Sequence, residues 1–173
     1  EQLNEEQLLQ IVDLMLEDTV KALSDKNINI EISEDAKKYF DEISKGTPVL
    51  DISDCPDLGP VLIALAALKN GATLVGTDRL RIKESDRGQA MHQELCKLGG
   101  GLVFGDNTIT VPKQQLNRID GALNGHNDHR IVMALSLVLS VYGGAVDDAR
   151  VVKKSYPGFF EDIKKLGAEV KTE

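Results

Sequence analysis

The segment from Arg79 to Arg87 has the residue types needed to bind an anion. It reads Arg-Leu-Arg-Ile-Lys-Glu-Ser-Asp-Arg and places four cationic and two acidic side chains within nine residues. Guanidinium groups bind phosphate and carboxylate through a planar fork of N–H donors. Glu84 and Arg87 are three residues apart, so they share a face if a helix begins near Lys83. The plain alternative is the solvated, charged start of a surface helix.

Other charged groups precede apolar runs elsewhere in the chain. Asp57 lies in Cys-Pro-Asp-Leu-Gly-Pro, Asp128-His-Arg130 precedes a long apolar run, and Lys154 lies in Lys-Lys-Ser-Tyr-Pro. Helix N-termini expose unpaired N–H groups and the positive end of the helix dipole, so cations beside them create sites for anions. Taken singly, Asp57 is explained as a helix cap or a first-turn acid, and Lys154 as a surface lysine.

Arg130 directly precedes a helix that is apolar on nearly every side, from Ile131 to Leu139. The start of such a helix should reach the core or a cleft. A buried arginine needs an anionic partner, either an internal carboxylate or a ligand. His126 and His129 are too few for a metal site, and the phosphate loop typical of nucleotide-binding proteins is missing from the sequence. We therefore expect no metal.

The bulk composition predicts a soluble globular domain. The chain has 173 residues, 42% of them apolar, which suffices for one domain or one domain with a small appendage. Its longest apolar stretch falls well short of the roughly 18 residues of a membrane span. A net charge of −8 with 4% aromatic residues argues against nucleic-acid binding. Two cysteines without a disulfide or metal spacing favour the cytoplasm.

Two parts of the chain differ in charge and in the pattern of their apolar residues and glycines. Residues 1–46 hold 12 of the 28 acidic side chains and predict a helix over 8–23, a strand over 28–32 and a helix from Ser33 that stops at Gly46. From residue 47 on, short apolar runs and glycines alternate, which is typical of an α/β arrangement. We therefore predict a domain boundary near residues 46–47.

An internal repeat organises residues 47–173. Asp57, Gly71 and Leu98-Gly99 correspond to Asp128, Gly143 and Leu166-Gly167 at offsets of 71, 72 and 68 residues. In each copy an acid-capped helix leads through glycine to a short strand, 72–75 or 145–147. The first copy ends in a predicted hairpin, 102–104 with 108–111. The sequence therefore predicts a β-α-β-α-β-β unit followed by most of a second.

Four motifs in this order resemble a known family. Pro56-Asp57, Lys-Glu-Ser-Asp-Arg at 83–87, Asn-Asp-His-Arg at 127–130 and Lys-Ser-Tyr-Pro at 154–157 are similar to the C-terminal half of 5-enolpyruvylshikimate-3-phosphate (EPSP) synthase. The resemblance covers residues 47–173. It implies the enolpyruvyl transferase fold, an α/β (α+β) class built from repeated β-α-β-α-β-β units, in agreement with the internal repeat.

The resemblance implies a transferase that moves the enolpyruvyl group of phosphoenolpyruvate to the 5-hydroxyl of shikimate 3-phosphate, in aromatic amino acid biosynthesis. Asp57 would contact the shikimate hydroxyls and act as a base, and Lys83 would contact the same substrate. Glu84 would handle protons at the methylene carbon. The remaining cations would hold phosphoenolpyruvate: Arg87, Arg130 and Lys154. No metal or organic cofactor is implied.

The resemblance also implies a partner, because the N-terminal half of the family has no counterpart in the sequence. Family members build the site between both halves, so this chain holds about half of it. Loss of positioning groups can forfeit much of the roughly 7–11 kcal/mol that proximity contributes. We therefore expect little or no synthase activity from the chain alone.

Residues 1–46 resemble, over a short stretch, the C-terminal small domain of Clp-type AAA+ ATPase chaperones, through 8–16, 27–33 and 36–40. That resemblance suggests a fusion of two fragments, and two rival functions remain open. One is the related enolpyruvyl transferase that acts on UDP-N-acetylglucosamine, which shares the fold. The other is a non-catalytic folding or interaction module made of enzyme fragments.

Overall fold

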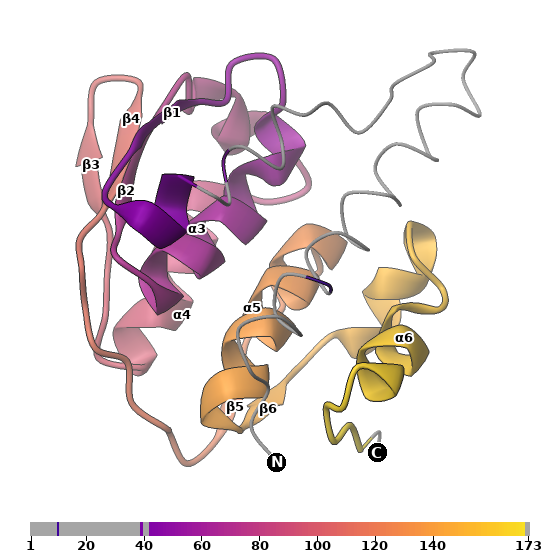
Figure 1. The fold of residues 1–173 in the computed structure, drawn as a ribbon. Helices are drawn as coiled ribbons and strands as arrows, with labels where there is room; N and C mark the ends of the chain where they lie inside the picture. Colours follow the sequence, from indigo (N-terminus) through magenta and orange to yellow (C-terminus); the bar gives the residue numbers. More distant parts are fainter. Residues whose placement is uncertain (1–9, 11–38, 40–41, 172–173) are drawn as a thin grey trace.

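A computed structural model describes residues 10, 39 and 42–171 (Figure 1). The first helix and the strand expected within residues 1–46 lie outside the described residues. Residues 42–45 are helical, and the Gly46 N–H donates to the Glu42 carbonyl at 3.1 Å, as expected for a helix that ends at this glycine. Ile43 is buried in the core, and Asn70 Nδ2 donates to the Ser44 carbonyl at 3.2 Å. The described end of this helix therefore packs on the following residues.

The first repeat forms a four-stranded sheet with helices on one side. Its elements are β1 (Val49–Asp51), η1 (Pro56–Leu58), α3 (Gly59–Leu68), β2 (Ala72–Val75), η2 (Asp78–Ile82), α4 (Arg87–Lys97), β3 (Val103–Gly105) and β4 (Thr108–Val111). The strand order is β1-β2-β4-β3. β1 and β2 are parallel, whereas β4 is antiparallel to both β2 and β3. The predicted β-α-β-α-β-β unit is confirmed.

Local sequence explains two features of this sheet. β4 reads Thr-Ile-Thr-Val, and its two apolar residues, Ile109 and Val111, are buried while the threonines are half-buried, as alternation predicts. Gly71 joins α3 to β2 with φ of +86°, and a Cβ there would lie 2.5 Å from the Val111 carbonyl oxygen. Only glycine fits this close passage between helix and sheet.

The second repeat follows the same order through its second helix. It consists of β5 (Ala122–Leu123), α5 (His129–Tyr142), β6 (Ala145–Val146), η3 (Ala149–Lys154) and α6 (Phe159–Lys165). β5 and β6 pair in parallel, as β1 and β2 do. Among the described residues, those after α6 form no strand, so the repeat is seen as β-α-β-α.

Two central helices contribute a large share of the core. α3 packs against α5, and α5 packs in turn against η3. Residues 59–67 of α3 and 130–139 of α5 are buried without interruption. Figure 1 shows the four-stranded sheet on one side, α3 and α4 beside it, α5 next and α6 on the far side. Within the described part of the chain, each helix is too short or too polar to cross a bilayer.

Candidate active site

Three helix starts that are far apart in the sequence meet at one cluster of charges. Asp57 precedes α3, Lys83 lies between η2 and α4, and Arg87 is the first residue of α4. Lys83 Nζ lies 3.0 Å and Arg87 Nη1 2.6 Å from the same oxygen, Oδ1 of Asp57. The structure therefore brings together the residues of the first two motifs.

Arg87 is the centre of this cluster. Its side chain is only 1% exposed and contacts three carboxylates, one through each guanidinium nitrogen. Besides Asp57, it donates through Nη2 to Glu84 Oε2 at 2.6 Å and through Nε to Asp128 Oδ2 at 2.8 Å. Burying a guanidinium is costly unless its donors are all engaged, and here the planar fork is used on every side.

Asp128 anchors the third helix start to this arginine. It is fully buried and caps α5, accepting from the Arg130 N–H at 2.9 Å through Oδ1. Its other oxygen also accepts from Ser85 Oγ at 3.0 Å. Burial alone would raise the pKa of Asp128, but the hydrogen bonds and charge of Arg87 outweigh it and hold the pKa below its usual value. Asp128 is thus a carboxylate that couples α4 to α5.

Two expectations about helix starts are wrong. α4 begins at Arg87 rather than near Lys83, because Asp86 caps it by accepting from the Gln89 N–H at 3.1 Å. Glu84 therefore reaches Arg87 from an extended turn and not along a shared helix face. Asp57 does not cap α3 either, since that helix has no side-chain cap and the Asp57 carboxylate is engaged by cations. The alternative of a first-turn acid holds, because Asp57 lies in the first turn of η1.

The carboxylate of Asp57 is held ionised and remains accessible. Burial would raise its pKa, but hydrogen bonds from Lys83 and Arg87 and the charges of Arg87 and Arg130 lower the pKa to about 2. Its side chain is 41% exposed and that of Glu84 is 47% exposed. The accessible carboxylates of Asp57 and Glu84 thus both contact the buried guanidinium of Arg87.

Arg130 adds a second buried cation at the start of α5. It is 8% exposed, and its charge lowers the pKa of Asp57. It also lowers the pKa of its neighbour His129, after burial, which is the larger cause. His129 is therefore neutral at pH 7, and the positive charge at this helix start belongs to Arg130. The expectation that Arg130 reaches the protein interior is confirmed.

Lys154 is the one predicted site residue that the structure does not join to this cluster. It is exposed at the end of η3, an element that packs on α5. Within residues 42–171, no hydrogen bond or ion pair links its ammonium group to the other five predicted residues. Its role stays a prediction.

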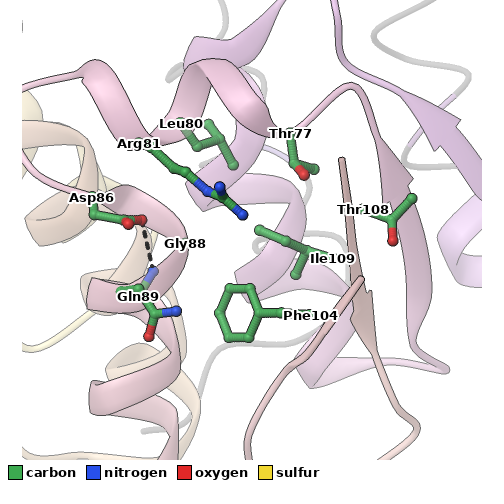
Figure 2. Close-up of a pocket in the computed structure, with 9 residues that line it drawn as sticks. All are labelled: Thr77, Leu80, Arg81, Asp86, Gly88, Gln89, Phe104, Thr108 and Ile109. Carbon is green, nitrogen blue, oxygen red and sulfur yellow. Dashed lines mark hydrogen bonds between the residues drawn. The ribbon is translucent and has the colours of Figure 1, made fainter. Parts of the chain in front are cut away.

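A small pocket beside η2 contains none of the six predicted residues among its lining side chains. Figure 2 shows it between η2, the start of α4 and the β3–β4 hairpin, with Arg81 pointing toward Ile109 and Phe104. Thr77 and Thr108 add hydroxyl groups to its wall. The charged cluster around Arg87 is therefore not part of this pocket.

Comparison with known proteins agrees with this geometry. The family model for EPSP synthase (3-phosphoshikimate 1-carboxyvinyltransferase) matches residues 5–163. The chain belongs to the EPSP synthase family. A 3-phosphoshikimate 1-carboxyvinyltransferase from Clostridium kluyveri is 40% identical over 154 residues, which are 87% of this chain and 36% of that protein. One from Clostridium acetobutylicum is 44% identical over 126 residues, which are 70% of this chain and 29% of that protein.

The fold is also that of EPSP synthase. An EPSP synthase structure from Acinetobacter baumannii superimposes with a TM-score of 0.59 and 28% sequence identity, covering 67% of this chain and 28% of that chain. This confirms the expected enolpyruvyl transferase fold. The chain spans about a third of the length of the curated relatives it matches, in line with a segment of the C-terminal half.

The EPSP synthase match is wider than the motifs alone indicated. It begins at residue 5, so it includes most of the segment for which we noted a resemblance to Clp-type chaperones. That resemblance falls almost wholly outside the described residues, and it stays untested. The same is true of the predicted boundary near residues 46–47.

Sequence reasoning placed Asp128 as the cap of a helix but gave neither Asp128 nor Ser85 a part in the site. Both lie inside EPSP synthase motifs: Asp128 accepts from Arg87 Nε, and Ser85 in turn donates to Asp128. The signal for Asp128 was available, because an acid that caps a wholly apolar helix must be buried with it.

Proposed function

We propose that the cluster around Arg87 binds the anionic groups of phosphoenolpyruvate and shikimate 3-phosphate in the enolpyruvyl transfer of EPSP synthase. The observation that carries this proposal is the convergence of Arg87 and Arg130 at helix starts, and of Lys83 just before α4, beside two accessible carboxylates. Such an array neutralises phosphate and carboxylate groups and leaves acids and bases close to them.

The carboxylates suit the proton transfers of this reaction. As the hydroxyl oxygen bonds to C2 of phosphoenolpyruvate, its proton must leave and another must reach the methylene carbon. In the second step the C2–O bond to phosphate breaks, and the methyl group gives up a proton. We assign Asp57 as the base that accepts the hydroxyl proton and Glu84 as the group that accepts the methyl proton. Lys83 would contact shikimate 3-phosphate.

The low pKa of Asp57 fits a base that is activated by its substrate. Lys83 and Arg87 lower this pKa, and the same two cations would be engaged by substrate anions. Once their charge is compensated, the pKa of Asp57 rises, which makes its carboxylate a stronger general base. Arg87, Arg130 and Lys154 are assigned to the carboxylate and phosphate of phosphoenolpyruvate and to the leaving phosphate.

We further propose that the site is completed by the N-terminal portion of an EPSP synthase, which implies little activity without it. Residues 47–173 would form the synthase domain that carries the four motifs, and residues 1–46 an acidic unit ahead of it that lies mostly within the EPSP synthase match. A cytoplasmic location is supported by the two cysteines, Cys55 and Cys96, which are both free thiols.

The first test is phosphoenolpyruvate binding by the intact chain, measured by calorimetry. Arg130→Ala should weaken binding at least tenfold, because a hydrogen bond to a charged group contributes about 1.5–3 kcal/mol. Arg118→Ala is the matched control: this exposed arginine lies near Gly143, at the opposite end of α5. Equal affinity in both variants would contradict the proposed anion site.

The second test is release of inorganic phosphate from phosphoenolpyruvate with shikimate 3-phosphate as acceptor. We expect none above the Glu84→Ala background for the chain alone, and release when the N-terminal portion of the Clostridium kluyveri relative is added. Competition with UDP-N-acetylglucosamine as acceptor tests the rival transferase. A chain that ignores all these substrates and stays monomeric would be the non-catalytic module instead.

A further inference from the structure

Glu94 is a second buried carboxylate on α4, outside the proposed site. It is 1% exposed and follows Arg87 by seven residues. Seven residues are two helical turns, about 10.5 Å along the axis, so both side chains leave α4 from the same face. That face also carries the buried residues Met91 and Leu95. A carboxylate in this position requires partners.

Among the described residues, the partners of Glu94 outside α4 belong to the loop that precedes α5. Oε2 accepts from the Asn124 N–H at 2.7 Å, and Oε1 lies 3.0 Å from His126 Nε2. Lys97, on α4 itself, donates to Oε2 at 2.6 Å. Burial alone would raise the pKa of Glu94, but these three hydrogen bonds hold it below its usual value. Glu94 is therefore a carboxylate that binds the loop backbone.

The loop needs such support because its backbone is strained. His126 and Asn127 have φ of +51° and +50°, a left-handed conformation that residues other than glycine rarely adopt. Within the loop, the His126 N–H donates to Asn124 Oδ1 at 2.7 Å. From the far side, the Asn127 N–H donates to Asp148 Oδ2 at 3.0 Å. The next residue is Asp128, which caps α5 and accepts a hydrogen bond from Arg87.

α4 therefore contacts the segment 124–128 through hydrogen bonds at two points. At its first residue, Arg87 donates to Asp128, and two turns later Glu94 accepts from the loop backbone at Asn124. One contact alone would leave the loop free to pivot about it. Two contacts from one rigid helix set both its position and its tilt, and with them the direction in which α5 begins.

We propose that Glu94 is a positioning residue, which holds the loop 124–127 so that Asp128 and Arg130 keep their places relative to Arg87. The inference rests on the proposed function only for the identity of the anion that Arg87 and Arg130 share. Displacements of about 1 Å can cost a hundredfold in rate, so a residue that touches no substrate can govern the site.

The test compares Glu94→Ala and Glu94→Gln with the wild-type chain by amide and guanidinium hydrogen exchange in NMR. The matched control is Glu161→Gln, because this glutamate is also paired with a lysine three residues away but is 70% exposed on α6. The reference amide is that of Leu74, in the centre of the sheet, which exchanges by global unfolding.

We expect Glu94→Ala to speed exchange at the Asn124 N–H and the Arg87 Nε–H by about tenfold or more relative to Leu74. Glu94→Gln should retain much of the Asn124 protection, because its amide oxygen can still accept from that N–H. Glu161→Gln should change neither. A merely stabilising role would instead speed all three sites together, and that outcome would overturn the proposal.

A phosphoenolpyruvate titration of the same samples separates this inference from the proposed function. Glu94→Ala should weaken binding by about tenfold while Glu161→Gln leaves it unchanged. If exchange at Arg87 rises but the affinity for phosphoenolpyruvate is unchanged, Glu94 is not a positioning residue for this site. If the wild-type chain binds no phosphoenolpyruvate, the proposed function fails, and the Arg87 exchange still decides whether Glu94 holds the loop.

Discussion

Asp128→Asn should destabilise the fold far more than its small change in size suggests. The substitution keeps an oxygen that can cap α5 but removes a fully buried carboxylate bound to Arg87. Breaking a buried ion pair by removing one partner costs about 3–5 kcal/mol. Arg87 keeps Asp57 and Glu84, so we expect the low end of that range, about 3 kcal/mol.

Urea unfolding measures this difference directly. With a slope of about 2 kcal/mol per molar, 3 kcal/mol lowers the midpoint by roughly 1.5 M. Glu84→Gln removes another carboxylate that pairs with Arg87, but this side chain is 47% exposed, so the substitution should cost under about 1 kcal/mol of stability. If the two variants lose the same stability, burial of Asp128 is not what makes its pairing with Arg87 important.

Two further predictions concern acid stability and backbone packing. The pKa of Asp57 is about 2 in the folded chain and near 3.9 in the unfolded chain, so its contribution to stability is complete above pH 4 and disappears as the pH falls through 2. Asp57→Asn should remove this contribution, about 1 kcal/mol after solvent screening, so the thermal midpoint should fall less steeply in acid. An equally steep fall in the variant would contradict this. Gly125→Ala should cost about 1–3 kcal/mol in urea unfolding, because its Cβ would lie 2.5 Å from Val132 Cγ2 and 2.6 Å from the Asp147 carbonyl oxygen. Gly46→Ala, with nothing within 4 Å of its Cβ, should be nearly neutral, and equal losses would refute the steric argument.

The sequence predicted the repeated unit because strand and helix signals there are local. Residues 72–75 form the expected strand, and Asp128 caps α5 as its position before an apolar run predicts. The hairpin was expected over 102–104 and 108–111 and forms over 103–105 and 108–111. Periodicity and capping are properties of neighbouring residues, so they can be seen without the fold.

The arrangement around Arg87 could be predicted only in part. Charge density identified Lys83, Glu84 and Arg87, and the four motifs added Asp57 and Arg130. Which of them would be buried was not visible, because Arg87 is covered by Asp128, which is 41 residues away in the chain. The start of α4 was also misplaced, since Asp86 was one of several polar residues able to cap it.

The uninterrupted burial of α5 gives the site a rigid side and an adjustable side. Arg130 is the second residue of α5, and the nine residues after it are all buried, so few substitutions there would leave the core intact. Lys83 and Glu84 reach the site from the end of the segment 79–84, where Arg79, Arg81 and Ile82 are exposed. In evolutionary terms, the α5 side should change only together with its neighbours. Variation in ligand preference should therefore accumulate first in the exposed turn, where a new side chain perturbs the site without unfolding the domain.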